Sequence, residues 1–193
     1  MRVIQLTTER LILRKPKKSD WKDIVEGAGE YDLAKTYNIL PHPYKKSDAE
    51  AFITNSIKNF GKDRYTFVVE LKAEKKVIGV LGLRNINQVN NTANTDSWIN
   101  KKYWRQGYIT EAKIALNDFA FSKLKLRRLD SSVYTTNKAS NAAQKKMGYR
   151  LEGTKRKAQR NVSTGKIHDV NIYGLLKEDW KKAKIKLLKK QIA

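Results

Sequence analysis

The sequence contains no cysteine and only two histidines, His42 and His168, and these absences exclude several kinds of site. Without cysteine there can be no disulfide bond and no thiolate ligand for a metal ion. Two isolated imidazoles do not make a zinc site, which takes three or four protein ligands. We therefore expect a protein without a bound metal.

Long apolar runs are absent as well. No uninterrupted run approaches the roughly 20 residues that a bilayer span needs. The N-terminal segment MRVIQLTTERLILRK alternates apolar with polar residues and lacks the apolar block of a signal peptide. We therefore expect a cytoplasmic protein with no membrane partner. Its 193 residues, 40% of them hydrophobic, favour one domain over residues 1–193.

Acidic residues are scarce, with 19 Asp and Glu against 41 Lys and Arg, and the net charge is +22. A field of this sign attracts acidic partners and repels cations. RNA, a ribosome surface or an acidic protein tail would fit it, through weak association that is not specific for sequence. A lysine-rich proteome or a gain in solubility would explain the same charge without any partner.

The spacing of apolar residues predicts the element order βααβββαβαββα, a mixed α/β domain with a central twisted sheet flanked by helices. Strands are expected at residues 10–15, 64–71, 76–85, 95–100, 127–134, 149–156 and 166–176. Helices are expected at 19–28, from Ser47 to Gly61, after Gly107, at 137–148 and at about 177–191. Ser47 and Glu50 have the spacing of a capping box, and residues 86–94 are expected to form a polar loop.

The expected C-terminal helix is basic and amphipathic. Trp180, Ala183 and Leu187 fall on one side of it, and residues 177–190 hold seven lysines but only one Glu and one Asp. This pattern favours a helix that covers an edge of the domain with a solvated outer face, and an RNA-binding tail is the alternative.

The stretch YWRQGYITEA, residues 103–112, places a single glycine, Gly107, directly before a helix-forming segment. Free N–H groups at a helix start and the positive end of the helix dipole together favour a bound phosphate. Glycine removes the Cβ that would keep a phosphate away from the main chain, and Arg105 adds a nearby cation. The alternative is a glycine that only eases the turn from strand to helix.

A second stretch, NKASNAAQKKMGYRLEG at residues 137–153, follows the next expected strand. Together the two stretches resemble two consecutive motifs of the GNAT superfamily of N-acetyltransferases. The segments TERLILR, HPYKKSDAEAF and HDVNIYGLLKEDW also fit, so the resemblance covers most of the chain. Within the superfamily the sequence is most similar to the ribosomal-protein N-terminal alanine acetyltransferases.

The resemblance implies acetyl-CoA as the cosubstrate. Of the superfamily signature Gln/Arg-x-x-Gly-x-Gly/Ala only Gly107 matches outright, because the last small residue is replaced by Ile109. The residues implied to surround the diphosphate are Arg105, Gln106, Gly107, Tyr108, Ile109 and Thr110. Trp98, Ile99 and Asn100 would pair with the pantetheine arm from one side and Asn137 from the other.

The resemblance also suggests catalytic residues. Ser140 sits where some relatives place the group that protonates the leaving thiolate, and a backbone N–H within 98–100 would polarise the thioester carbonyl. Related enzymes often carry a base at the position that is Asn94 here, so Asp96, two residues on and on the same sheet face, is our candidate base. Three further positions are weaker candidates for a catalytic carboxylate. Some relatives carry a carboxylate at the position that is Gln159 here. Asp169 is more typical of a turn or capping residue, and Glu111 is more typical of a helix face.

The shortage of strong bases favours an acceptor that is already neutral. An α-amino group is neutral about one time in ten at pH 7, a lysine side chain only about once in 2,500. We therefore expect a protein N-terminus as acceptor, for example that of a ribosomal protein or an acidic tail. Tyr31, Tyr37 and Tyr44 would line the acceptor side or simply pack in the core.

Two alternatives remain open at this stage. One is a small-amine or antibiotic acetyltransferase, which the positive charge disfavours because its substrates are cations. The other is a relative without catalysis that binds ribosomes or nucleic acid, which Asn94 and Gln159 support. The sequence leaves a monomer and a homodimer equally open.

Overall fold

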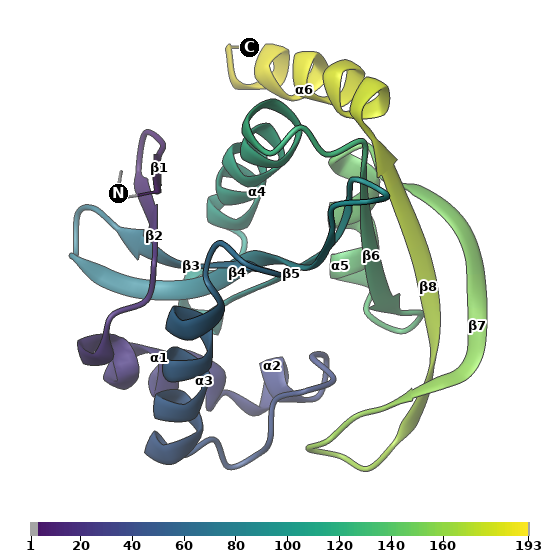
Figure 1. Ribbon diagram of the computed structural model, residues 1–193. Helices are drawn as coiled ribbons and strands as arrows, with labels where there is room; N and C mark the ends of the chain where they lie inside the picture. Colours follow the sequence, from purple (N-terminus) through teal and green to yellow (C-terminus); the bar gives the residue numbers. More distant parts are fainter. Residues whose placement is uncertain (1–3, 193) are drawn as a thin grey trace.

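One mixed sheet with helices on both faces organises the protein, and the computed structural model describes residues 4–192 (Figure 1). The strands are β1 (Gln5–Thr7), β2 (Leu11–Arg14), β3 (Tyr65–Leu71), β4 (Lys76–Asn87), β5 (Thr92–Ile99), β6 (Arg128–Tyr134), β7 (Arg150–Arg160) and β8 (Ile167–Leu176). The helices are α1 (Trp21–Ala28), α2 (Tyr31–Ala34), α3 (Lys46–Asn59), α4 (Tyr108–Asp118), α5 (Lys138–Lys146) and α6 (Lys177–Ile192). The expected mixed α/β fold is confirmed. The expected domain bounds include residues 1–3 and 193, which lie outside the described residues, so these bounds stay a prediction.

The strand order is β1-β2-β3-β4-β5-β6-β8-β7 across the described residues. Every neighbouring pair is antiparallel except β5 and β6, which are parallel. A parallel pair needs a crossover connection, and α4 provides it. Strand β4 lies at the centre, and its residues 77–83 are all buried, as expected of a strand covered on both faces.

Two apolar clusters pack against the two faces of the sheet. Helices α4 and α6 lie above the sheet in Figure 1, and their buried side chains Ala112, Leu116, Trp180 and Leu187 join the larger cluster. Helices α1, α2 and α3 lie below it, where Ile24, Leu33 and Ile53 join the second cluster together with Trp98 of β5. The helices thereby hold β5 from both sides.

The feature of the sheet that matters most for function is the separation of β5 from β6. The two strands pair only where Thr92–Asn94 faces Arg128–Asp130. Beyond that point β5 stays with β4, and β6 stays with β8. The main-chain edges of 95–99 and 131–134 therefore face each other across a gap, and polar main-chain groups on such edges need partners.

Several sequence expectations about local structure were wrong. The structure has two additional short elements, β1 and α2, and residues 86–94 are not one polar loop because β4 extends to Asn87 and β5 begins at Thr92. Helix α3 begins before Ser47, and the acidic residue that caps it is Asp48, whose carboxylate accepts the Lys45 N–H at 2.7 Å. These errors arise because long-range pairing extends the strands and because two acidic residues, Asp48 and Glu50, lie only two positions apart.

The C-terminal helix was predicted correctly. Trp180 is 3% exposed, and its indole N–H donates to Asp118 Oδ1 at 3.0 Å, which ties α6 to the end of α4. Ile185, on the opposite side of α6, is 57% exposed. The helix thus covers the core with one face, while Lys181, Lys182, Lys186 and Lys189 are exposed to solvent.

We expect Trp180→Ala to lower the free energy of unfolding by about 3–5 kcal/mol, because it leaves a cavity where a buried ring had packed. Urea denaturation followed by circular dichroism would measure the change. Ile185→Ala on the same helix is the control, with an expected change within about 0.5 kcal/mol. Equal losses for the two variants would contradict this orientation of α6.

Candidate active site

A cavity of about 670 Å³ occupies the gap between β5 and β6. It extends from the start of α4, at Gly107, past the first turns of α5 and on to Asp96 of β5. Segment 32–38, which includes part of α2, and Gln159 of β7 complete its far end. The cavity is therefore lined both by a helix N-terminus, at Gly107, and by a carboxyl group, that of Asp96.

Gly107 is the N-cap of α4 and has a positive φ of 81°, a conformation that favours glycine. No side chain caps the helix, so the N–H groups of its first turn have no intrahelical partner and remain available to a ligand. A Cβ built on Gly107 would find Arg10 Nη2 at 3.5 Å as its nearest neighbour and would otherwise project into open space. The geometry suits an anion held against bare main chain.

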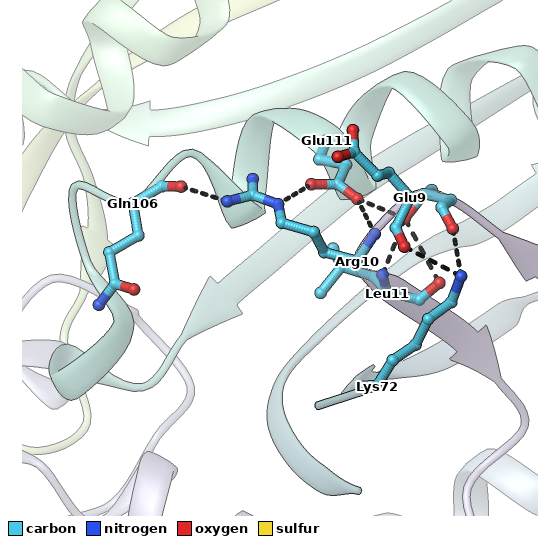
Figure 2. Close-up of polar contacts among 7 residues, drawn as sticks. Glu9, Arg10, Leu11, Lys72, Gln106 and Glu111 are labelled. Atoms are coloured by element: carbon cyan, nitrogen blue, oxygen red, sulfur yellow. Dashed lines mark hydrogen bonds and ion pairs between the residues drawn. The ribbon is translucent and has the colours of Figure 1, made fainter. Parts of the chain in front are cut away.

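Arg10 and Glu111 hold this helix start in place, as Figure 2 shows. The Arg10 guanidinium donates to Glu111 Oε2 at 2.7 Å and to the Gln106 carbonyl at 3.1 Å. The Glu111 carboxylate also accepts from the Arg10 N–H and from the Thr8 hydroxyl. Because the Gln106 carbonyl is tied to Arg10, the turn before Gly107 keeps its orientation, and the N–H groups of the first turn face the cavity.

These contacts confirm the structural interpretation of Glu111. Burial raises the pKa of its carboxyl, but the hydrogen bonds from Thr8 and Arg10 and the Arg10 charge outweigh burial and leave the pKa below its ordinary value of 4.5. A carboxylate of this kind is a poor base and a good anchor. Its partners lie in and beside the TERL segment that the resemblance singled out.

Not all of the three residues expected to pair with the pantetheine arm, Trp98, Ile99 and Asn100, direct their main chain toward the gap. The Asn100 N–H donates to the Ile78 carbonyl at 2.8 Å, so by the alternation of an antiparallel ladder Trp98 also directs its main chain toward β4. Ser97 and Ile99 instead direct theirs toward the gap. The Ile99 carbonyl there accepts from the Trp104 indole N–H at 2.6 Å. Ser97, which the sequence did not single out, is thus a main-chain candidate that the strand register identifies.

The other predicted coenzyme residues divide into two groups. Arg105, Tyr108, Ile109 and Asn137 line the cavity with Trp98 and Ile99. Asn100, Gln106 and Thr110 do not line it. The Asn100 side chain accepts the Lys102 N–H, and the Gln106 amide donates to the Lys102 carbonyl, so both stabilise the turn between β5 and α4.

Asn137 and Ser140 lie at the start of α5. The Asn137 Oδ1 accepts the Ser140 N–H at 3.0 Å, which caps the helix and leaves the Asn137 amide as a donor for a ligand. Both residues line the cavity opposite β5. Their helix therefore presents a carboxamide and a hydroxyl to whatever occupies the gap.

Asp96 lies on the acceptor end of the cavity beside Arg84, whose Nε is 3.2 Å from the carboxylate. Tyr37 lines the same cavity and lowers the pKa of this carboxyl group. Burial raises the pKa of Asp96 above its ordinary value of 3.8, while Arg84 and Tyr37 act in the opposite direction. A raised carboxyl pKa makes a better proton acceptor, so the geometry is compatible with the role of base.

The remaining candidates are separated by their contacts. Gln159 lines the cavity, but Asp169 accepts the Lys157 N–H at 2.7 Å within the β7–β8 hairpin, as expected of a structural residue. Of the three tyrosines only Tyr37 lines the main cavity. Tyr31 is 51% exposed beside His42, and Tyr44 packs in the second apolar cluster.

The tip of the β7–β8 hairpin closes the acceptor end. The Asn161 side chain, fully buried, donates to the Ala34 carbonyl at 2.9 Å, and the Val162 N–H donates to the Asn38 carbonyl at 3.1 Å. These bonds join two segments about 125 residues apart in the chain. The hairpin tip therefore holds in place the segment 32–38 that lines the cavity.

Comparison with known proteins agrees with this geometry. Residues 10–150, which include the helix start at Gly107 and most of the cavity, match the family model described as an acetyltransferase (GNAT) domain. The chain therefore belongs to the GNAT acetyltransferase family, and it is an N-acetyltransferase that uses acetyl-CoA. Within residues 4–192 no helix has the length and apolarity of a membrane span, and no cluster of three or more potential ligands could hold a metal ion.

Three similar proteins illustrate the range of relatives. The "Uncharacterized N-acetyltransferase YoaA" of Bacillus subtilis (strain 168) is 28% identical over 172 residues, which cover 89% of this chain and 96% of YoaA. The "Ribosomal-protein-serine acetyltransferase" of Escherichia coli (strain K12) is 30% identical over 52% of this chain and 55% of its own length. The solved structure of RimL, "Ribosomal L7/L12 alpha-N-protein acetyltransferase", in complex with coenzyme A has a TM-score of 0.80 at 19% identity, covering 90% of this chain and 98% of RimL.

We expect Gly107→Trp to weaken coenzyme A binding by about tenfold or more, since a side chain there would cover the free N–H groups at the positive end of α4. Isothermal titration calorimetry would measure the affinity. Gly61→Trp is the matched control, because Gly61 has nearly the same φ, 82°, in the turn between α3 and β3. Both variants carry the same backbone strain, so equal affinities in the two would contradict the anion site.

We expect Glu111→Gln to lower stability at pH 7 by about 1–3 kcal/mol, because it removes charged hydrogen bonds. The depressed pKa of Glu111 stabilises the folded state above the ordinary pKa of 4.5, and this contribution is lost as the pH falls through the folded value. The difference from the wild type should therefore shrink in acid. Urea denaturation across that range would show it, and Glu50→Gln at an exposed ion pair with Lys46 is the control. A difference independent of pH would contradict the assignment.

Proposed function

We propose that this acetyltransferase acts on the α-amino group of a protein N-terminus. The observation that carries the proposal is the lining of the cavity, in which the candidate base is the carboxyl group of Asp96, a weak base. An α-amino group that is already neutral attacks without prior deprotonation, and a carboxylate can take the proton that its nitrogen loses after the attack. A lysine side chain, about 2.5 pKa units more basic, would rarely reach the neutral form that attacks.

Each residue along the cavity has a proposed part in the transfer. The first-turn N–H groups after Gly107, with Arg105, would hold the coenzyme diphosphate, and Asn137 together with the open edge of β5 would hold its pantetheine arm. A main-chain N–H of that edge would polarise the thioester carbonyl. Asp96 would take a proton from the attacking amine, and the Ser140 hydroxyl would hydrogen-bond the leaving sulfur.

The acceptor is proposed to be a ribosomal protein or a protein with an acidic N-terminal tail. The net charge of +22 attracts an acidic chain, and the relatives named for ribosomal-protein acetylation share this fold. The reaction would then take place in the cytoplasm. The same charge would repel polyamines and aminoglycosides, which makes a small cationic amine the weaker candidate.

A pair of peptides tests the choice of acceptor. One peptide has a free N-terminal Ala or Ser and no lysine, and the other has a blocked N-terminus and one internal lysine. At pH 7 we expect the free N-terminus to be acetylated about two orders of magnitude faster, in line with its larger neutral fraction. Mass spectrometry of the products with acetyl-CoA would measure both rates, and faster lysine modification would refute the proposal.

The same assay can test Asp96. Asp96→Asn is expected to slow transfer to the free N-terminus, whereas Asp169→Asn, in the hairpin and away from the cavity, should leave the rate close to that of the wild type. Thermal unfolding with acetyl-CoA at 100 times its dissociation constant should show about 2.7 kcal/mol of stabilisation in both variants. Spermidine as acceptor covers the small-amine alternative, and a higher rate with it would refute the N-terminal assignment.

A further inference from the structure

Lys113 is a charged residue of the cavity lining that takes no part in the reaction proposed above. It lies on α4, is partly buried, and lines the gap between β5 and β6. Its Nζ donates to Gln144 Oε1 of α5 at 3.4 Å. An ammonium group has three donors, and in the described part of the chain Lys113 forms no ion pair. The group is thus positioned in the cavity with donor capacity left over.

Gln144 is held so that it directs Lys113. Its amide nitrogen donates to Ser131 Oγ of β6 at 2.6 Å, which turns the carbonyl oxygen toward Lys113. Gln144 is only 3% exposed, and it lies one helical turn after Ser140 on the same face of α5. The ammonium group therefore faces the part of the cavity next to Ser140, where the proposed function puts the sulfur atom.

The charged and titratable groups around Lys113 come from several elements. The carboxylate of Asp96 on β5 raises the pKa of Lys113. Asp96 is itself paired with Arg84 of β4, and Tyr37 lowers its pKa. The Tyr149 hydroxyl contacts Thr95 of β5. Burial lowers the pKa of Lys113 to about 8, against the opposing effect of Asp96. The side chain is therefore mostly cationic at neutral pH, and within the described residues it interacts with Asp96 without forming an ion pair.

We propose that Lys113 stabilises and protonates the thiolate of coenzyme A as it leaves during acetyl transfer. This inference rests on the proposed placement of the coenzyme. The amine nitrogen forms a bond to the acetyl carbon, the carbon–sulfur bond breaks, and its electron pair stays on sulfur. Lys113 gives that sulfur a proton and regains one from solvent, while the proton released by the amine passes to Asp96. Ser140 then orients the sulfur rather than supplying the proton.

Binding measurements test Lys113 without relying on turnover. The variants are Lys113→Met, which keeps the length but removes the charge, and Lys113→Arg, which keeps the charge. Lys146→Met, at an exposed position of α5, controls for the change in net charge. The readout is the pKa of the bound coenzyme A thiol, measured by the ultraviolet absorbance of its thiolate during a pH titration at saturating coenzyme A.

In the wild type we expect the bound thiol to have a pKa below that of free coenzyme A. Lys113→Met should raise it by about one unit or more, the effect expected from losing a neighbouring positive charge. Lys113→Arg should restore most of the shift, and Lys146→Met should leave it unchanged. Equal thiol pKa values in the wild type and Lys113→Met would overturn the inference.

Desulfo-coenzyme A separates this role from a structural one. Because it lacks the sulfur, the wild type and Lys113→Met should bind it with the same affinity. At alkaline pH, Lys113→Met should bind coenzyme A more weakly than the wild type does. A matching loss of affinity for both ligands would show that Lys113 only supports the cavity and would overturn the inference. A wild-type protein that binds neither ligand would instead overturn the placement of the coenzyme, and with it the proposed function.

Discussion

The end of pairing between β5 and β6 is the constraint on which the site depends. Each strand keeps a partner on its outer side, β4 for β5 and β8 for β6, so the sheet remains whole while its centre opens. The opened edges carry main-chain donors and acceptors that cannot remain buried without partners. A ligand with amide groups can pair with such edges as a further strand would. The crossover helix α4 begins at the mouth of this gap and adds its free N–H groups to the same cavity.

Charge is distributed unevenly along that cavity. Arg105, Lys138 and the start of α4 make the outer end positive, which suits phosphate groups. At the inner end Asp96 and Lys113 approach from opposite sides of the sheet, and each changes the proton affinity of the other. A proton acceptor for the amine and a proton donor for the sulfur would then lie on the two sides of the reacting bond. Paired groups whose environments shift their pKa values are typical of acid and base roles in catalysis.

The sequence predicted the sheet, the C-terminal helix and the position of Gly107, because these follow from apolar periodicity and from the conformational demand of one turn. It missed β1, whose three residues gain their structure by pairing with β2, and α2, which is a single turn held by its contacts. Strand register explains why Ser97 rather than Asn100 faces the gap, and register is set by pairing with β4, not by local pattern. The sequence does not single out Lys113, because it is one of many lysines. Only its contact with Gln144 of α5 and its partial burial in the cavity distinguish it.

The acceptor end is built from the parts of the chain that local pattern describes least. The tip of the β7–β8 hairpin bonds to the segment after α2 through Asn161 and Val162, and both segments are short and irregular. The main-chain carbonyls of Ala34 and Asn38 accept these bonds, and the buried Asn161 side chain is the donor in the first of them. The coenzyme end, by contrast, is held by Arg10 and Glu111 to the first strands of the sheet. The coenzyme end is thus fixed by an ion pair to the sheet, whereas the segment that lines the cavity near Asp96 is held by contacts between two loops.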